Sequence, residues 1–117
     1  MRIERELMRG AGPVAVLKLL EPRERYGYEL VEALSRRTDG VLAMGQSTLY
    51  PMLYNLEAKG QIKGEWKAGP GGRQRKYYRL TPKGRRRLSR DSLQWNAVVR
   101  AMEAIGVVAG PNPGAST

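Results

Sequence analysis

The chain has 117 residues and carries 21 Lys and Arg against 11 Asp and Glu, a formal net charge of +10. Cys and His are absent, which excludes disulfides, thiolate or imidazole metal ligands and the common histidine general base, so we predict neither an enzyme nor a cofactor or metal. The longest apolar run, Val14 to Leu17, is far shorter than the roughly 18 residues of a membrane span, and no signal peptide follows Met1, so we expect a cytoplasmic protein without a membrane partner.

The first residues, 1–12, are expected to form an amphipathic arm ahead of the first helix. Ile3, Leu7 and Met8 occur at helical spacing among Arg and Glu, which indicates a segment that lies against another surface, such as a second subunit. Pro13 suits the first position of a helix. The apolar sequence that follows predicts a buried helix ending before Pro22.

Two further helices are predicted over residues 26–37 and 46–59. Each has apolar residues at intervals of three and four, which is the spacing of a single buried face. Gly40 stands where the C-terminal cap of the first of them would lie. Because a proline is tolerated only in the first turn of a helix, Pro51 favours Ser47 as the N-cap of the other.

The outer face of the helix at 46–59 is polar and close to a positive helix N-terminus, so it can meet phosphates and base edges. The residues expected there are Ser47, Thr48, Pro51, Tyr54 and Asn55. Helix capping alone explains Ser47 and Thr48 equally well, and both roles can coexist. For Tyr50, packing at the edge of the domain and contact with phosphate are both open.

A hairpin with a cationic tip follows, because residues 62–67 and 75–80 alternate with period two around the glycine-rich turn 69–72. Nine basic residues and no acid occur between Arg73 and Arg90. Such a block is typical of a nucleic-acid binder, although a solvated helix face would also explain its later part. The best candidates for contact with the DNA backbone are Arg73, Arg75 and Lys76.

The last helix is expected over residues 83–106, after Thr81 as N-cap and Pro82 at the first helical position. It carries an apolar stripe that the small domain can hardly cover, so we expect it to join two chains: Leu88, Trp95, Val99 and Met102. Trp95 is an anchor of that interface or a residue that stacks on a planar ligand. Residues 107–117 have turn composition and are expected to be disordered.

Three helices followed by a two-stranded wing predict an α+β fold, mainly α, with a winged helix-turn-helix over residues 13–82. Three motifs occur in order: Tyr26-Gly27-Tyr28-Glu29-Leu30, Ser47-Thr48-Leu49-Tyr50-Pro51 and Lys76-Tyr77-Tyr78-Arg79-Leu80-Thr81-Pro82-Lys83-Gly84. In this combination the chain resembles the PadR family of bacterial transcriptional regulators, in the smaller branch with a single C-terminal helix.

The resemblance implies a repressor that binds double-stranded DNA at a pseudo-palindromic operator as a homodimer. It implies that the C-terminal helix joins the subunits together with the N-terminal arm, through Leu7 and Met8, and that Tyr26 lies near the DNA backbone. It also implies release from DNA by a small aromatic molecule, stacked by Trp95 and its symmetry mate.

Two other functions are compatible with the residues alone. A winged-helix module for protein–protein interaction would present an apolar third helix, whereas this face is polar. A small basic RNA-associated protein would carry aromatic platforms on an open sheet, whereas this chain offers one hairpin. The chain also departs from the family pattern at Gly10, Gly12 and Pro13, and at Tyr54-Asn55, where many relatives carry basic residues.

Overall fold

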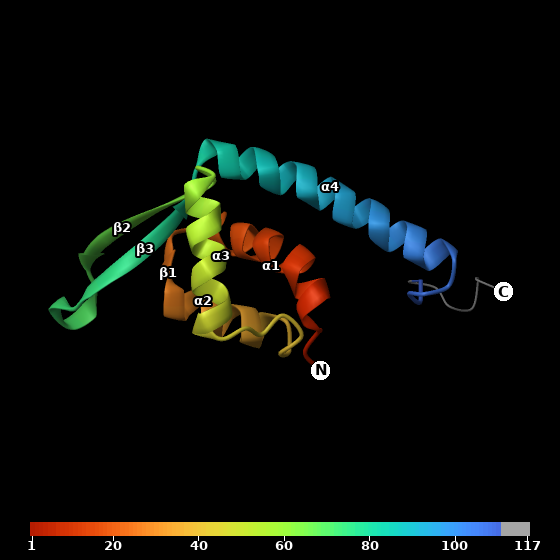
Figure 1. Ribbon diagram of the computed structural model, residues 1–117, viewed down its shortest axis with the longest axis horizontal. Coiled ribbons are helices and arrows are strands. Elements are labelled where there is room, and N and C mark those ends of the chain that lie inside the picture. Colours follow the sequence, from red (N-terminus) through yellow and green to blue (C-terminus); the bar gives the residue numbers. More distant parts are fainter. Residues whose placement is uncertain (111–117) are drawn as a thin grey trace.

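The chain folds into four α-helices and one small antiparallel sheet in a computed structural model that describes residues 1–110 (Figure 1). The elements are α1 Arg5–Leu20, β1 Arg25–Tyr26, α2 Gly27–Arg37, α3 Gln46–Ala58, β2 Ile62–Ala68, a 3-10 turn Pro70–Gly72, β3 Gln74–Leu80 and α4 Pro82–Ala104. This order confirms the predicted α+β fold, a winged helix-turn-helix followed by one long C-terminal helix.

α1 begins at Arg5 and continues through Pro13, so the expected arm and the first helix are one element. The predicted helix start at Pro13 is therefore wrong. A proline inside a helix costs about 3 kcal/mol, because it removes a backbone hydrogen bond and crowds the carbonyl four residues earlier. Burial offsets this cost, since α1 packs Met8, Val16, Leu17, Leu19 and Leu20 into the core. At Gly12 α1 approaches α3 so closely that a Cβ would lie 2.6 Å from Met52 Cε.

α2 and α3 form the helix-turn-helix. After α2 the Gly40 N–H donates to the Ser35 carbonyl at 2.8 Å, and Gly40 has a φ of 81°, which confirms its predicted capping role. α3 begins at Gln46, but its N-cap is Gly45 and not the predicted Ser47. Pro51 thus lies inside α3, where it removes only the hydrogen bond to the Ser47 carbonyl.

The sheet has the strand order β1-β3-β2, with both pairs antiparallel. β2 and β3 are the predicted wing, and their core end is buried at Ile62 and Leu80. β1 adds a third strand by pairing Tyr26 with Tyr77, and two residues are too few to show a period in sequence. Period-two alternation predicts that Trp66 shares the buried face of β2 with Ile62, but Trp66 is 68 % exposed because the wing extends beyond the core.

α4 begins as predicted, because the Thr81 hydroxyl accepts a hydrogen bond from the Gly84 N–H at 3.0 Å. The C-terminal part of α4 projects beyond the other helices, in the direction opposite to the wing (Figure 1). After α4 the N–H groups of Val107 and Val108 donate to the Met102 carbonyl, which corrects the expected disorder at 107–110. The rest of that predicted tail, 111–117, lies outside the described residues.

Candidate nucleic-acid interface

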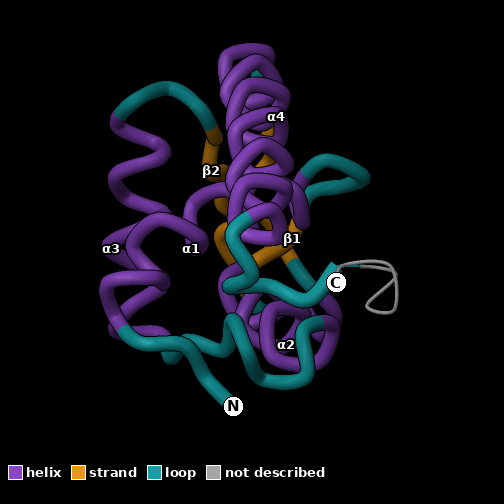
Figure 2. The backbone as a smooth tube through the Cα atoms, turned by 90° about the vertical axis from the view of Figure 1, so that its right-hand side faces the viewer, coloured by secondary structure: helices purple, strands orange, loops and turns teal. Residues whose placement is uncertain are grey.

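The exposed face of α3 is polar and uncharged. Leu49, Leu53 and Leu56 are at most 2 % exposed and pack this helix against the core. On the other side the residues predicted to meet DNA are all exposed: Ser47, Thr48, Pro51, Tyr54 and Asn55. The N-cap Gly45 offers no side chain to the first amide groups, so the positive end of α3 stays open toward anions. α3 lies at the edge of the molecule, as the rotated view shows (Figure 2).

Tyr50 connects α3 with the start of α2. Its hydroxyl packs against Gly27 so closely that a Cβ at Gly27 would overlap it. The ring nevertheless remains 43 % exposed. Tyr50 therefore packs within the domain and still presents part of its ring to solvent.

A groove of about 610 Å³ separates the wing from the N-terminal ends of α2 and α3. It brings two predicted contact residues, Tyr26 and Tyr50, together with the three wing cations, Arg73, Arg75 and Lys76. Ser47 and Thr48 do not line it. Two exposed aromatic side chains that sequence reasoning missed also line the groove, namely Tyr28 and Trp66. Period-two alternation, the only sequence signal at Trp66, had placed it on the buried face.

The three wing cations differ in whether an acidic side chain neutralises their charge. Lys76 Nζ lies 3.3 Å from Glu57 Oε1, so an acid shares its charge. Arg75 stacks on Tyr26, with 4.4 Å between the guanidinium carbon and the ring centroid. Among residues 1–110, Arg73 and Arg75 take part in no ion pair. These two arginines therefore carry the uncompensated charge at the tip of the wing.

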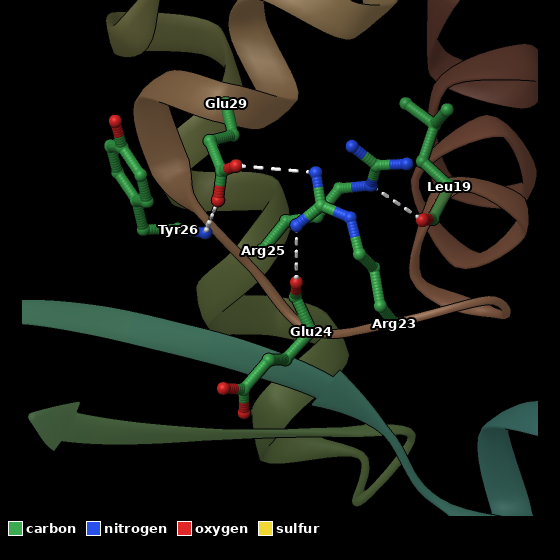
Figure 3. A network of polar contacts seen from close by, with 6 residues as sticks. All are labelled: Leu19, Arg23, Glu24, Arg25, Tyr26 and Glu29. Atoms are coloured by element: carbon green, nitrogen blue, oxygen red, sulfur yellow. Dashed lines mark hydrogen bonds and ion pairs between the residues drawn. The ribbon is translucent and has the colours of Figure 1, made fainter. Parts of the chain in front are cut away.

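A hydrogen-bond network fixes Tyr26 at the start of α2 (Figure 3). The Tyr26 N–H donates to Glu29 Oε1 at 3.1 Å, and Arg23 donates to the other carboxylate oxygen at 3.3 Å. Arg25 Nε donates to the Leu19 carbonyl at 2.8 Å, which ties the same segment to α1. Burial lowers the pKa of the Arg25 guanidinium, which stays charged at neutral pH. The network holds the aromatic ring that Arg75 covers.

Glu57 joins the end of α3 to the wing. Its carboxylate accepts a hydrogen bond from the Gly64 N–H of β2 at 2.9 Å and another from Lys76 of β3 at 3.3 Å. The Gly64 hydrogen bond, assisted by Lys76, lowers the pKa of Glu57 below its ordinary value. The ionised carboxylate thus holds both strands of the wing against α3.

A second hollow, of about 550 Å³, lies between α1 and the first turn of α3. Ser47 and Thr48 line it from α3, and three side chains from the N-terminal segment line it opposite them: Arg2, Arg5 and Arg9. Sequence reasoning missed these arginines, because Glu4 and Glu6 alternate with them along the chain. Only the packing of α1 against α3 reveals that they gather beside Ser47.

The sequence model of the transcriptional regulator PadR-like family matches residues 16–90, from within α1 through the helix-turn-helix and the wing into α4. The chain belongs to the PadR-like family of transcriptional regulators. The resemblance carried by the three sequence motifs is thereby confirmed. As a PadR-like protein the chain is a transcriptional regulator and not an enzyme.

Individual PadR-like relatives agree with the family assignment. The transcriptional regulator Rv3488 of Mycobacterium tuberculosis is 38% identical over 87 residues, which cover 74% of this chain and 78% of that protein. A crystal structure of a Streptococcus transcriptional regulator superposes with a TM-score of 0.77 at 35% identity, covering 87% of this chain and 98% of that one. A PadR family regulator from Eggerthella lenta gives 0.74 at 35% identity, covering 86% and 85%.

The residues predicted for a subunit interface of this PadR-like chain divide into two groups. Trp95, Val99 and Met102 are 38–41 % exposed on the projecting part of α4, and Leu7 on α1 is 62 % exposed. Met8 and Leu88, in contrast, are 6 % and 3 % exposed in the core of the chain itself. Their expected place on an interface is corrected, because α1 and the start of α4 bury them within one chain.

Beside Trp95 lies an apolar hollow of about 560 Å³ that Val14 and Ala15 of α1 also line. No group of His, Cys, Asp and Glu side chains in residues 1–110 could hold a metal ion. Within the same range, no helix is both long and apolar enough to span a bilayer.

Proposed function

We propose that this PadR-like regulator acts as a repressor that binds a pseudo-palindromic operator as a homodimer. The observation that carries the proposal is the position of the uncharged polar face of α3 beside the free cations of the wing. Ser47, Thr48 and Asn55 can donate and accept hydrogen bonds at base edges in the major groove. Arg73 and Arg75 suit the phosphates, which position the protein without specifying sequence.

The exposed stripe on α4 supports the homodimer. A helix that leaves Trp95, Val99 and Met102 between 38 and 41 % exposed can bury them against a second copy. Joined in this way, two α3 helices would enter major grooves about one helical turn, or 34 Å, apart. Operator binding then depends on the separation that the two α4 helices set.

The hollow beside Trp95 supports release by a small planar aromatic molecule bound between the subunits. Such a ligand would act by binding better to a dimer whose α3 helices have the wrong separation. If the ligand favours that form of the dimer by about 1–2 kcal/mol, it lowers the operator affinity about five- to thirty-fold.

The main test is to select bound fragments from a random duplex pool and to measure the affinity of the selected operator at several salt concentrations. If the dimer neutralises about six phosphates, a plot of the logarithm of the association constant against the logarithm of the salt concentration should have a slope of about −5. Arg73→Gln with Arg75→Gln should weaken binding to all duplexes, whereas Asn55→Ala should affect operator and random DNA unequally. A slope near zero refutes DNA binding, and a pool that yields single half-sites refutes the dimeric operator.

The ligand needs a separate test, because the chain contains two tryptophans. In a Trp66→Phe variant Trp95 is the sole indole, and a flat cationic aromatic dye should quench its fluorescence. In a Trp95→Phe variant, which keeps Trp66, the quenching should disappear while the dimer persists. Equal quenching in both variants rejects the site beside Trp95.

A further inference from the structure

The three arginines that line the second hollow come from one short segment of the chain and lie opposite Ser47 and Thr48. Arg5 and Arg9 are four residues apart on α1 and therefore share a face, and Arg2 precedes the helix. All three are exposed, and none forms an ion pair in the part of the chain that the structure describes. Glu4 and Glu6 do not line the hollow. Of the charges that alternate in sequence, only the positive ones line the hollow.

The N-terminal part of α1, which carries Arg5 and Arg9, lies on the side of α3 opposite the wing (Figure 1). Arg9 also lines a smaller hollow with Asn55 and Lys59, so positive charge continues along α3 beyond its first turn. The close approach of Gly12 to Met52 fixes α1 against α3 and so fixes where these arginines stand. The reading face of α3 is flanked by the wing cations on one side and by the α1 arginines on the other.

We propose that Arg2, Arg5 and Arg9 bind the DNA backbone along the edge of the major groove opposite the wing. The inference rests on the proposed entry of α3 into that groove. The major groove is about 12 Å wide and has a phosphate strand along each edge, so a helix lying in it is flanked by phosphates on both sides. The wing binds one of these strands and the α1 arginines bind the other. The uncharged face of α3 therefore needs no cations of its own.

The test uses the full chain and an operator selected with the wild-type protein. These contacts add to those of the wing, so the wild-type slope should be steeper than the value of about −5 for six phosphates, and each lost contact reduces its magnitude by about 0.9. Arg5→Gln with Arg9→Gln should therefore reduce its magnitude by about 1.8 per bound protomer and weaken operator and random duplexes alike. Arg5→Lys with Arg9→Lys should keep the slope. If the double variant is poorly stable, the two single Gln variants can replace it. Each of them should reduce the magnitude of the slope by about 0.9 per bound protomer.

The matched control is Arg36→Gln with Arg37→Gln, which removes the same charge from two exposed positions in the last turn of α2. Neither of these arginines lines the three hollows beside α3. The slope should therefore not change in this control. An equal loss in both double variants, or an unchanged slope for Arg5 and Arg9, overturns the inference.

Failure of this inference differs from failure of DNA binding itself. If the wild-type chain binds no duplex, the proposed function fails. If the wild-type slope is steep and falls for Arg73→Gln with Arg75→Gln, but not for the α1 pair, only the second row of phosphate contacts is rejected.

Discussion

The guanidinium carbon of Arg75 lies over the ring of Tyr26, 4.4 Å from its centroid. The contact joins the wing to the start of α2, at the point where β1 pairs with β3. An arginine held in this way loses less conformational freedom when it meets a phosphate than a free side chain does. We therefore expect the ring of Tyr26 to support DNA binding through Arg75, even without a contact of its own.

Replacing Tyr26 by Leu should lower DNA affinity about two- to five-fold, the equivalent of a partly exposed cation–π contact of about 0.5–1 kcal/mol. Tyr26→Phe keeps the ring face and should bind like the wild type. Fluorescence anisotropy with a labelled duplex at one fixed salt concentration measures both. Similar losses for Leu and Phe would assign the effect to the phenol hydroxyl and not to stacking.

Gly27→Ala should displace Tyr50, because the added Cβ would overlap the Tyr50 hydroxyl. The half-exposed ring can rotate outward, so we expect a loss of stability below the roughly 1–3 kcal/mol of an overpacked core. DNA affinity should fall more clearly, because the ring then stands in the groove beside the wing. Thermal unfolding and duplex titration separate the two effects.

The second substitution Tyr50→Phe, added to Gly27→Ala, removes the atom that clashes first and should restore part of the affinity. If Gly27→Ala alone binds DNA like the wild type, the position of Tyr50 has no influence on binding.

Acid should weaken the fold through Glu57. Because its pKa is lowered in the folded chain, its contribution is fully present above the ordinary value of 4.5 and is lost as the pH falls through the lowered value. At pH 7, Glu57→Gln should be less stable than the wild type by up to about 1 kcal/mol, a figure reduced for solvent exposure. In strong acid the two proteins should converge. Urea unfolding across this pH range measures the difference.

Glu65→Gln is the control, since Glu65 lies on β2 and pairs with Arg79 at 3.5 Å in an exposed position. Its stability difference from the wild type should be small at every pH. A Glu57→Gln difference that does not shrink in acid would show that the carboxylate charge does not stabilise the wing.

Helices and strands that neighbouring residues in the chain determine could be predicted from the sequence. Thr81 and Pro82 mark the start of α4 because a cap and its helix are adjacent in the chain. The path of α1 could not be predicted, since the continuation through Pro13 depends on the burial of Met8 and on contact with Met52 of α3. Such contacts between distant segments leave no period in the sequence.

The candidate site divides in the same way. Helical spacing predicts which side of α3 is exposed, and Ser47 and Asn55 lie there. The arginines beside Ser47 and the stacking of Arg75 on Tyr26 depend on how α1 and β1 pack, so sequence alone could not give them. An apolar stripe cannot by itself show whether a residue faces its own core or a partner, which is why Leu88 was misplaced.

The projecting part of α4 gives the sharpest test of assembly. If Val99 is buried between two copies, Val99→Asp places an unpaired charge in that interface, which costs several kcal/mol and should leave a monomer at micromolar concentration. DNA affinity should fall as well, because a monomer engages one half-site without the gain from a linked second contact. Sedimentation measures the mass, and Arg100→Gln, an adjacent exposed position on the same helix, should stay dimeric. If Val99→Asp remains a dimer, the subunits are joined by a surface other than this part of α4.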